Sequence, residues 1–288
     1  MSPDTDPTGE SADAAAAGRD TDPMSPAGAD SAGVPWAGRS FQPNAHAADD
    51  GRAPEALSDA LRRFRSGDGG QGDVVAEFGR SRLLIPLLAE LGDPSTGSGG
   101  AVGPEIGAHG LAVDKSQELS IVTVEGPDGR RVLPVFASVE AMSRWNPLSR
   151  PVPADGVRVA LAAAADGTDL VVLDPGSPTE FVLRRPAVWA VAQSQPWHPP
   201  FDSPDVRDAF ARSIGTELAV LGVDLTAGDP DARLAGPELI VRLTLVGGLT
   251  RAELDAVLQR LAARWAADDA IATLVDSLTV RLVDRDPA

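Results

Sequence analysis

The sequence has no cysteine, no tyrosine, a single lysine and three histidines. Without cysteine, the chain has no disulfide framework, no thiolate metal site and no cysteine nucleophile, which fits a reducing compartment. His46, His109 and His198 stand far apart in the sequence, whereas a zinc site needs three or four converging ligands. We therefore expect neither a metal nor a cofactor.

Long apolar runs are also missing, and so is a balance of charge. No apolar run approaches the ~20 residues that span a bilayer, and residues 1–30 lack the basic start and apolar centre of a secretory signal. Acidic side chains outnumber basic ones by 42 to 25, which gives a formal net charge of -17. Such a surface repels a phosphate backbone. We expect a soluble, cytoplasmic protein that binds neither membrane nor nucleic acid.

Common catalytic motifs are absent too. The glycine-rich stretch 92–103 is not followed by the lysine of a phosphate-binding loop, and no G-x-S-x-G elbow occurs. Ser138 follows an apolar run where a nucleophile can stand, but its neighbours are not glycines and a helix N-cap accounts for it. The acid-rich turns 166–174 and 224–231 match no EF-hand, so we interpret them as solvated turns. The chain is therefore predicted to be non-catalytic, with a hydrolase as a distant alternative.

The N-terminal segment 1–53 is rich in Ala, Gly, Pro, Ser and Asp. It cannot bury enough apolar area to offset its chain entropy, so a disordered tail is expected. Within it, the segment 34–44 holds Trp36, Arg39 and Phe41. These residues either dock on the folded body or on a partner, or are idle exposed aromatics.

Residues 54–193 are predicted to form a first domain. A helix begins near Pro54 and the run RLLIPLLAEL has the length of a strand, with Pro86 suited to an edge or an irregular point. ELSIVTVE and RRVLPVF flank a Gly-Pro-Asp-Gly turn and indicate a hairpin. Residues 154–165 favour a helix, 170–173 and 180–183 a strand pair, and 186–192 a closing helix.

A proline-rich linker at 194–202 is predicted to precede a second domain, 203–285. Ser203-Pro204 is typical of a helix start, and Thr250 with Glu253 forms a capping box. Alternating apolar residues predict three strands, so the order is helix, strand, strand, helix, strand. The fold class is thus α/β of the α+β type, with two small domains that each pack helices on a mixed sheet.

Large side chains concentrate between residues 136 and 197. The set consists of Phe136, Trp145, Phe181, Arg184, Arg185, Trp189 and Trp197. Ordinary core packing explains such a set, because aromatics dominate cores as readily as interfaces. The alternative is an interaction surface anchored by Trp145, Arg184, Arg185 and Trp189.

Several segments resemble the SseB-like family, named for enhanced serine sensitivity, and in particular its actinobacterial members. The resemblance is carried by LRRFRSGDGGQGDVVAEF, SRLLIPLLAEL, LPVFASVEAMSRW and TDLVVLDPGSPTEFVLRRPAVWAVA, together with the 34–44 segment. It covers roughly residues 34–200, and the region after 203 is similar to the variable second domain of family members. No matching position is catalytic, and the resemblance implies no settled biochemical activity.

The sequence leads to two functional hypotheses from different classes. The first is a cytoplasmic protein-interaction or regulatory protein with an unknown protein partner. The second is a sensor whose pocket between the domains binds a small molecule; the family's name suggests an amino acid.

Overall fold

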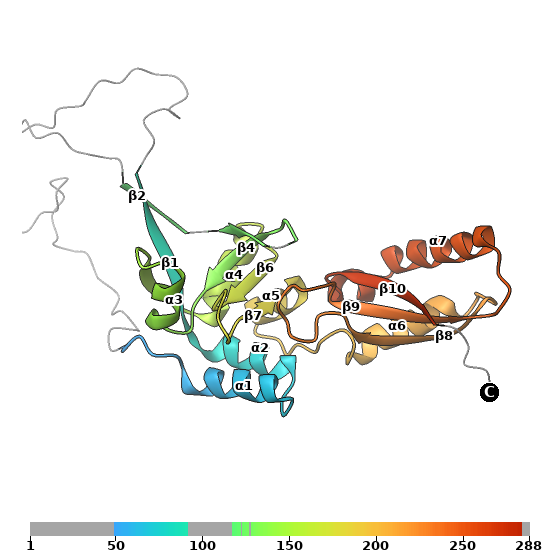
Figure 1. Cartoon of the computed structure of the whole chain (residues 1–288), viewed down its shortest axis with the longest axis horizontal. Coiled ribbons are helices and arrows are strands. Elements are labelled where there is room, and N and C mark those ends of the chain that lie inside the picture. The colour runs from blue at the N-terminus through green and yellow to red at the C-terminus, as the bar shows by residue number, and fades with distance from the viewer. Residues whose placement is uncertain (1–48, 92–116, 122, 127, 284–288) are drawn as a thin grey trace, which may run out of the picture. The chain divides into compact units, whose positions relative to one another are not determined.

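A computed structural model gives an α+β chain, which confirms the predicted fold class (Figure 1). The structure describes residues 49–91, 117–121, 123–126 and 128–283. The helices are α1 (Glu55–Ser66), α2 (Gln71–Arg80), α3 (Val139–Trp145), α4 (Gly156–Ala165), α5 (Arg185–Ala192), α6 (Pro204–Ile214), α7 (Arg251–Ala267) and α8 (Asp269–Leu274). The strands are β1 (Arg82–Leu91), β2 (Gln117–Ile121), β3 (Val124–Glu125), β4 (Arg131–Val135), β5 (Arg150–Asp155), β6 (Leu170–Leu173), β7 (Phe181–Leu183), β8 (Val220–Ala227), β9 (Leu239–Leu245) and β10 (Leu278–Val283).

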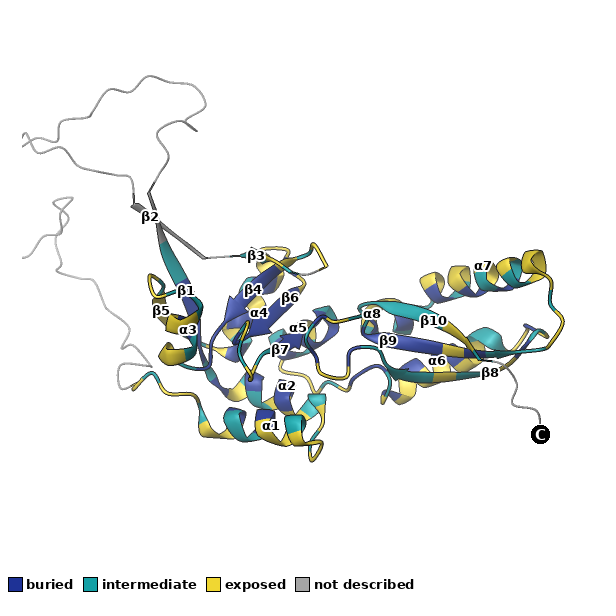
Figure 2. Ribbon diagram, in the orientation of Figure 1, coloured by how far each residue is buried: buried dark blue, intermediate teal, exposed yellow. Residues whose placement is uncertain are grey.

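The four-stranded sheet β3-β4-β6-β7 is mixed and is buried on both faces. Only β4 and β6 run parallel. Side chains alternate along each strand, so Leu133 and Val171 join the core under α1, α2, α4 and α5, while Val132 and Val172 point to the opposite face. Strands β4, β6 and β7 are largely dark blue in Figure 2. Two-sided burial explains why this part of the sequence has continuous apolar runs rather than alternation.

A second sheet, β2-β1-β5, is antiparallel and was only partly predicted. The hairpin partner of β4 is the short β3, whereas β2 pairs with β1. Pro151 lies in β5 opposite Pro86 of β1. On its other side β1 meets Phe136 at Leu84 and β2 from Leu87 onward. On this side, the partner of β1 therefore changes at Pro86. This is the irregular point expected for a residue without an amide donor.

The C-terminal region follows the predicted order, with α8 as an addition. Strand β9 lies between antiparallel β8 and parallel β10. Helices α6, α7 and α8 contribute buried residues to one core with these strands, including Phe210, Leu261 and Ile271. The short helix α8 is capped by Asp268, whose carboxylate accepts N–H bonds from Ala270 and Ile271. No helix within the described ranges is both long and apolar enough to cross a membrane.

The described chain begins at Asp49, ahead of the predicted helix start. The Asp49 carboxylate lies 2.7 Å from the Arg82 guanidinium at the start of β1. The Gly51 carbonyl accepts the Val139 amide at the first position of α3. Residues 49–52 are therefore held against the body, while the predicted tail before Asp49, including the segment 34–44, lies outside the described residues.

Residues 228–237 join β8 to β9 and pack on β7. The Ala232 carbonyl accepts the Val182 amide at 2.8 Å, and Leu234 covers the β4-β6-β7 face opposite the helices. Ala232 and Leu234 have φ angles of 48° and 56°, in the left-handed region that residues with a Cβ seldom adopt. We call residues 228–237 the docked segment.

Candidate functional site

The predicted anchors Trp145 and Trp189 differ in exposure. Trp145 ends α3, is partly buried and packs on Phe136 with ring centroids 5.3 Å apart. Trp189 on α5 is 40% exposed, and the Arg185 guanidinium lies 5.5 Å from the centre of its ring. Arg185 also donates to the carbonyls of Ala272 and Val275. Of the two, Trp189 presents the larger free aromatic surface.

Arg184 is buried, so it does not offer an exposed anchor. Its side chain is 7% exposed, and its Nη2 lies 2.7 Å from Asp229 Oδ2. Asp229 is itself 4% exposed and accepts amides from Arg233 and Leu234. The interpretation of the 224–231 turn as fully solvated was therefore wrong at Asp229. Both side chains serve to hold the docked segment.

Further charged groups surround this ion pair. Asp276, just before β10, accepts from Arg184 Nη1 at 3.3 Å and from Arg130 Nη1 at 2.9 and 3.0 Å. Its amide donates to Glu238 Oε2 at 2.7 Å. We call Arg130, Arg184, Asp229, Glu238 and Asp276 the Arg184 cluster. It holds three carboxyl groups against two guanidiniums, so one carboxyl has no cation of its own within the cluster.

That carboxyl belongs to Glu238. Burial raises the pKa of Glu238 to about 7, and the nearby charge of Asp276 adds to this effect. The Asp276 amide and the charges of Arg184 and Arg185 act in the opposite direction, and burial prevails. Glu238 therefore changes its protonation state near neutral pH.

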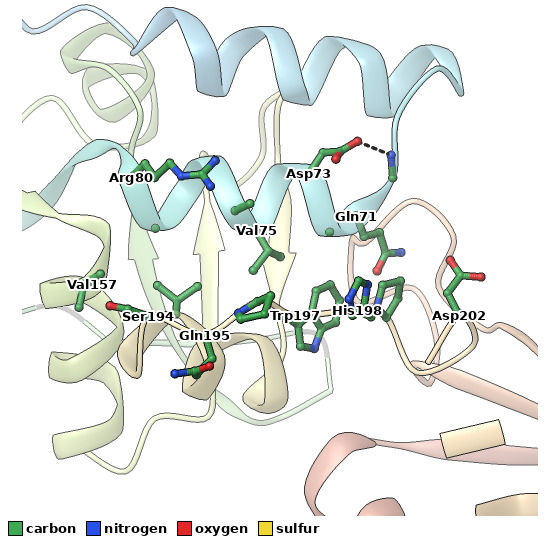
Figure 3. A pocket seen from close by; sticks show the side chains of 17 residues that line it. Gln71, Asp73, Val75, Arg80, Val157, Ser194, Gln195, Trp197, His198 and Asp202 are labelled. Carbon is green, nitrogen blue, oxygen red and sulfur yellow. Dashed lines mark hydrogen bonds between the residues drawn. The ribbon is translucent and has the colours of Figure 1, made fainter. Parts of the chain in front are cut away.

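A groove lies beside α2, and we call it the α2 groove (Figure 3). It measures about 640 Å³. One wall is α2 and the other is the stretch 194–202, the predicted linker. The lining residues are Gly70, Gln71, Gly72, Asp73, Val75, Ala76, Gly79, Arg80, Val157, Val191, Ser194, Gln195, Pro196, Trp197, His198, Pro199 and Asp202.

The groove has an apolar centre and polar ends. Val75, Val191 and the partly buried Trp197 supply the apolar part. Figure 3 shows Arg80 at one end and Gln71 with Asp202 toward the other. The Asp73 carboxylate is already used, because it accepts the Gly70 amide at 3.1 Å as part of the cap of α2. Such a surface suits an apolar group flanked by polar atoms.

The groove and the Arg184 cluster are joined by one contact. Gln71 lines the groove, and its Nε2 lies 3.4 Å from the Asp229 carbonyl. Arg184 is also the N-cap residue of α5, the helix that carries Val191 into the groove. A displacement of the docked segment therefore changes the environment of a groove residue.

Ser138 has the structural role predicted for it. Its Oγ accepts the Ala141 amide at 3.1 Å and caps α3. The neighbouring Ala137 amide donates to Asp174 Oδ1 at 2.8 Å, and burial raises the pKa of Asp174. Two of the motifs that carry the family resemblance are thus joined by one buried hydrogen bond.

The sequence indicated the walls of the groove but not the cavity. Of the two walls, the stretch 194–202 was predicted as a linker, and only the aromatic Trp197 among its three prolines marked it as unusual. Among the described residues, no group of three or more His, Cys, Asp or Glu side chains converges as metal ligands do.

Comparison with known proteins agrees with the resemblance over one part of the chain. Residues 57–190 match the family model described as the SseB protein N-terminal domain. The matched stretch runs from α1 to α5 and carries one wall of the α2 groove together with Arg184. No curated protein and no solved structure matches the chain. The match over residues 57–190 therefore supports the SseB-like family.

Proposed function

We propose that this chain is a non-catalytic, cytoplasmic protein-interaction or regulatory protein whose α2 groove receives an apolar part of a protein partner. The observation that carries the proposal is the extent of the apolar surface. Val157 lines the groove, and Leu161, one turn further along α4, is 51% exposed. Apolar surface therefore continues beyond the cavity, farther than one small ligand covers.

Trp189 adds a second exposed apolar residue to this region of the fold. Aromatic and arginine side chains are enriched at the centres of protein interfaces. Arg185 keeps the Trp189 ring in place through the cation–π contact and through its bonds to α8 carbonyls. This supports Arg185 and Trp189 as an additional anchor, whereas the burial of Arg184 favours a positioning role for that residue.

The test is a substitution that fills the groove without removing core. Ala76 is exposed on α2 and lines the groove, so Ala76→Trp places a large side chain in the binding space. Ala263, an exposed alanine on α7, provides the matched control Ala263→Trp. We expect pull-down from lysate of the source organism to recover a partner with the parent protein and Ala263→Trp, and to lose it with Ala76→Trp.

Two results would contradict the proposal. One is the absence of any partner above background, with or without residues 34–44. The other is equal recovery by both tryptophan variants, since a partner that ignores the groove binds elsewhere. Loss of the partner on deletion of 34–44 alone would instead move the binding function to that segment.

A small-molecule sensor is the second candidate, and the cavity volume favours it. About 640 Å³ lies within the range of ligand pockets, roughly 300–1,000 Å³. A ligand present at 100 times its dissociation constant stabilises the folded protein by ~2.7 kcal/mol. A thermal-shift screen with an amino-acid panel tests the version suggested by the family's name, and a flat response across the panel would remove it.

The finer assignment to the actinobacterial type is also a proposal. It is supported by the resemblance of the described motifs and of the 34–44 segment to members of that type. Grouping the 57–190 stretch with SseB-type sequences from many bacterial phyla tests it, and placement outside the actinobacterial group would contradict it.

A further inference from the structure

The docked segment is held by contacts from several parts of the N-terminal region. Arg184 Nη2 binds both Asp229 and the Gly236 carbonyl, at 2.7 and 2.8 Å, so one buried guanidinium joins the two ends of the segment. Arg65 Nη1 donates to the Asp231 carbonyl at 2.7 Å. Hydrogen bonds and charge thus fix the segment in addition to the apolar packing of Ala232 and Leu234.

The base of the segment is narrow. A Cβ on Gly228 would stand 2.2 Å from the Pro237 carbonyl oxygen, so only glycine fits there. The Gly228 amide donates to the Glu238 carbonyl at 3.0 Å. Glu238 is therefore placed at the base of the segment, just before β9. Its carboxyl accepts the Asp276 amide, and Asp276 binds Arg184, so a change in the charge of Glu238 reaches the segment through these two residues.

The groups that face Glu238 come from every element packed against it. Asp276 from the start of β10 donates its amide to Oε2 and adds negative charge, and Ser277 Oγ accepts the Glu238 amide at 3.0 Å. Arg184 and Arg185 approach from α5. Arg184 already binds Asp229 and Asp276, so its charge and that of Arg185 compensate an ionised, buried Glu238 only in part.

We propose that the docked segment is a pH-controlled element: protonated Glu238 keeps residues 228–237 bound to β7 and α5, and ionised Glu238 favours their release. Release also frees Gln71 from the Asp229 carbonyl and so alters one end of the α2 groove. The link to the groove rests on the proposed function, whereas release of the segment does not.

The direction of the pH effect follows from linkage. The pKa of Glu238 is about 7 in the docked state and near the ordinary 4.5 when the carboxyl is hydrated. The docked state therefore binds more protons between these values, and docking weakens as pH rises through this window. With these two pKa values, the equilibrium for opening increases about tenfold from about pH 6 to about pH 8.

Hydrogen exchange of single amides measures this opening. The Val182 amide, bonded to the Ala232 carbonyl, reports the docked segment, and the Leu84 amide, bonded to the Phe136 carbonyl, reports the N-terminal body. After correction for the intrinsic exchange rate, we expect the protection factor of Val182 to fall about tenfold from about pH 6 to about pH 8 and that of Leu84 to stay constant. An unchanged Val182, or an equal fall at Leu84, would overturn the proposal.

Glu238→Gln keeps the shape of the side chain and removes its titration. The variant is expected to abolish the pH dependence at Val182, while the control Glu217→Gln, on the loop before β8, leaves it intact. A pH dependence that persists in Glu238→Gln would assign the effect to another group and overturn the proposal.

The link to the groove has its own readout. The side-chain amide resonances of Gln71 should shift over the same pH range in the parent protein and remain fixed in Glu238→Gln. If Val182 responds and Gln71 does not, segment release stands and its link to the groove is refuted. Neither readout uses a partner, so failure of the proposed function is separately visible in the pull-down.

Discussion

Two charged groups of similar size behave in opposite ways in this molecule. The Arg184 cluster places three carboxyl groups beside two guanidiniums. The other group, which we call the Glu217 group, places the Glu217 carboxylate beside Arg260 and Arg264, with bonds of 2.8 to 2.9 Å. One has an excess of acid and the other an excess of base.

This difference determines the direction of each pKa shift. Hydrogen bonds from Arg260 hold the pKa of Glu217 below its usual value, whereas burial without a cation of its own raises the pKa of Glu238 to about 7. Both carboxyl groups are little exposed. Burial is the largest cause of the shift at Glu238, whereas at Glu217 the hydrogen bonds and charges of the two arginines outweigh burial.

Arg184→Met should have the largest effect, because it leaves Asp229 and Asp276 without their shared cation. Removing one partner of a buried ion pair costs about 3–5 kcal/mol. Urea denaturation at neutral pH measures the loss in free energy of unfolding. A loss as small as that of an exposed pair would show that the cluster is hydrated.

Asp229→Asn should cause the next largest loss in the free energy of unfolding. The variant keeps an oxygen that accepts segment amides but removes the charge opposite Arg184. Hydrogen bonds to charged groups contribute about 1.5–3 kcal/mol, so we expect a loss in that range by urea denaturation. An unchanged free energy of unfolding would mean that the hydrogen bonds from the amides alone hold the segment.

Arg264→Met in the Glu217 group should cost less, about 1 kcal/mol or below. The Arg264 side chain is 34% exposed, and Arg260 still bonds both oxygens of Glu217 after the substitution. The same denaturation assay applies. A loss equal to that of Arg184→Met would erase the distinction between the two groups.

Glu217→Gln removes the charge that Arg260 and Arg264 share, and its effect should depend on pH. Because the folded-state pKa of Glu217 is lowered, its stabilisation is present above the unfolded pKa and is lost as pH falls through the folded value. The variant should therefore lose less stability on acidification than the parent. A steeper acid dependence in the variant would contradict the direction of the shift.

Local features of the fold could be predicted from the sequence. Ser138, Ser203 and Thr250 were recognised as caps, and each accepts the expected backbone amide. Capping depends on residues three positions apart, so the information lies within one helical turn. The strand pair β6–β7 likewise follows from apolar patterning with turn residues between.

Features that join distant residues could not be predicted. Arg184 and Asp229 lie 45 positions apart, and nothing near either residue indicates that they meet in the interior. The acid-rich turn at Asp229 has the composition of a solvated turn, and only the docked segment's contacts with β7 bury it. The α2 groove also depends on two segments more than 100 positions apart.

A titration of the Glu238 side-chain carboxyl carbon by NMR tests the contrast between the two groups most directly. Burial of Glu238 within the Arg184 cluster, together with the charge of Asp276, predicts a midpoint near 7 for Glu238. A midpoint near the ordinary 4.5 would contradict it, because the cluster would then hold an ionised Glu238 at neutral pH and the docked segment would have no pH control.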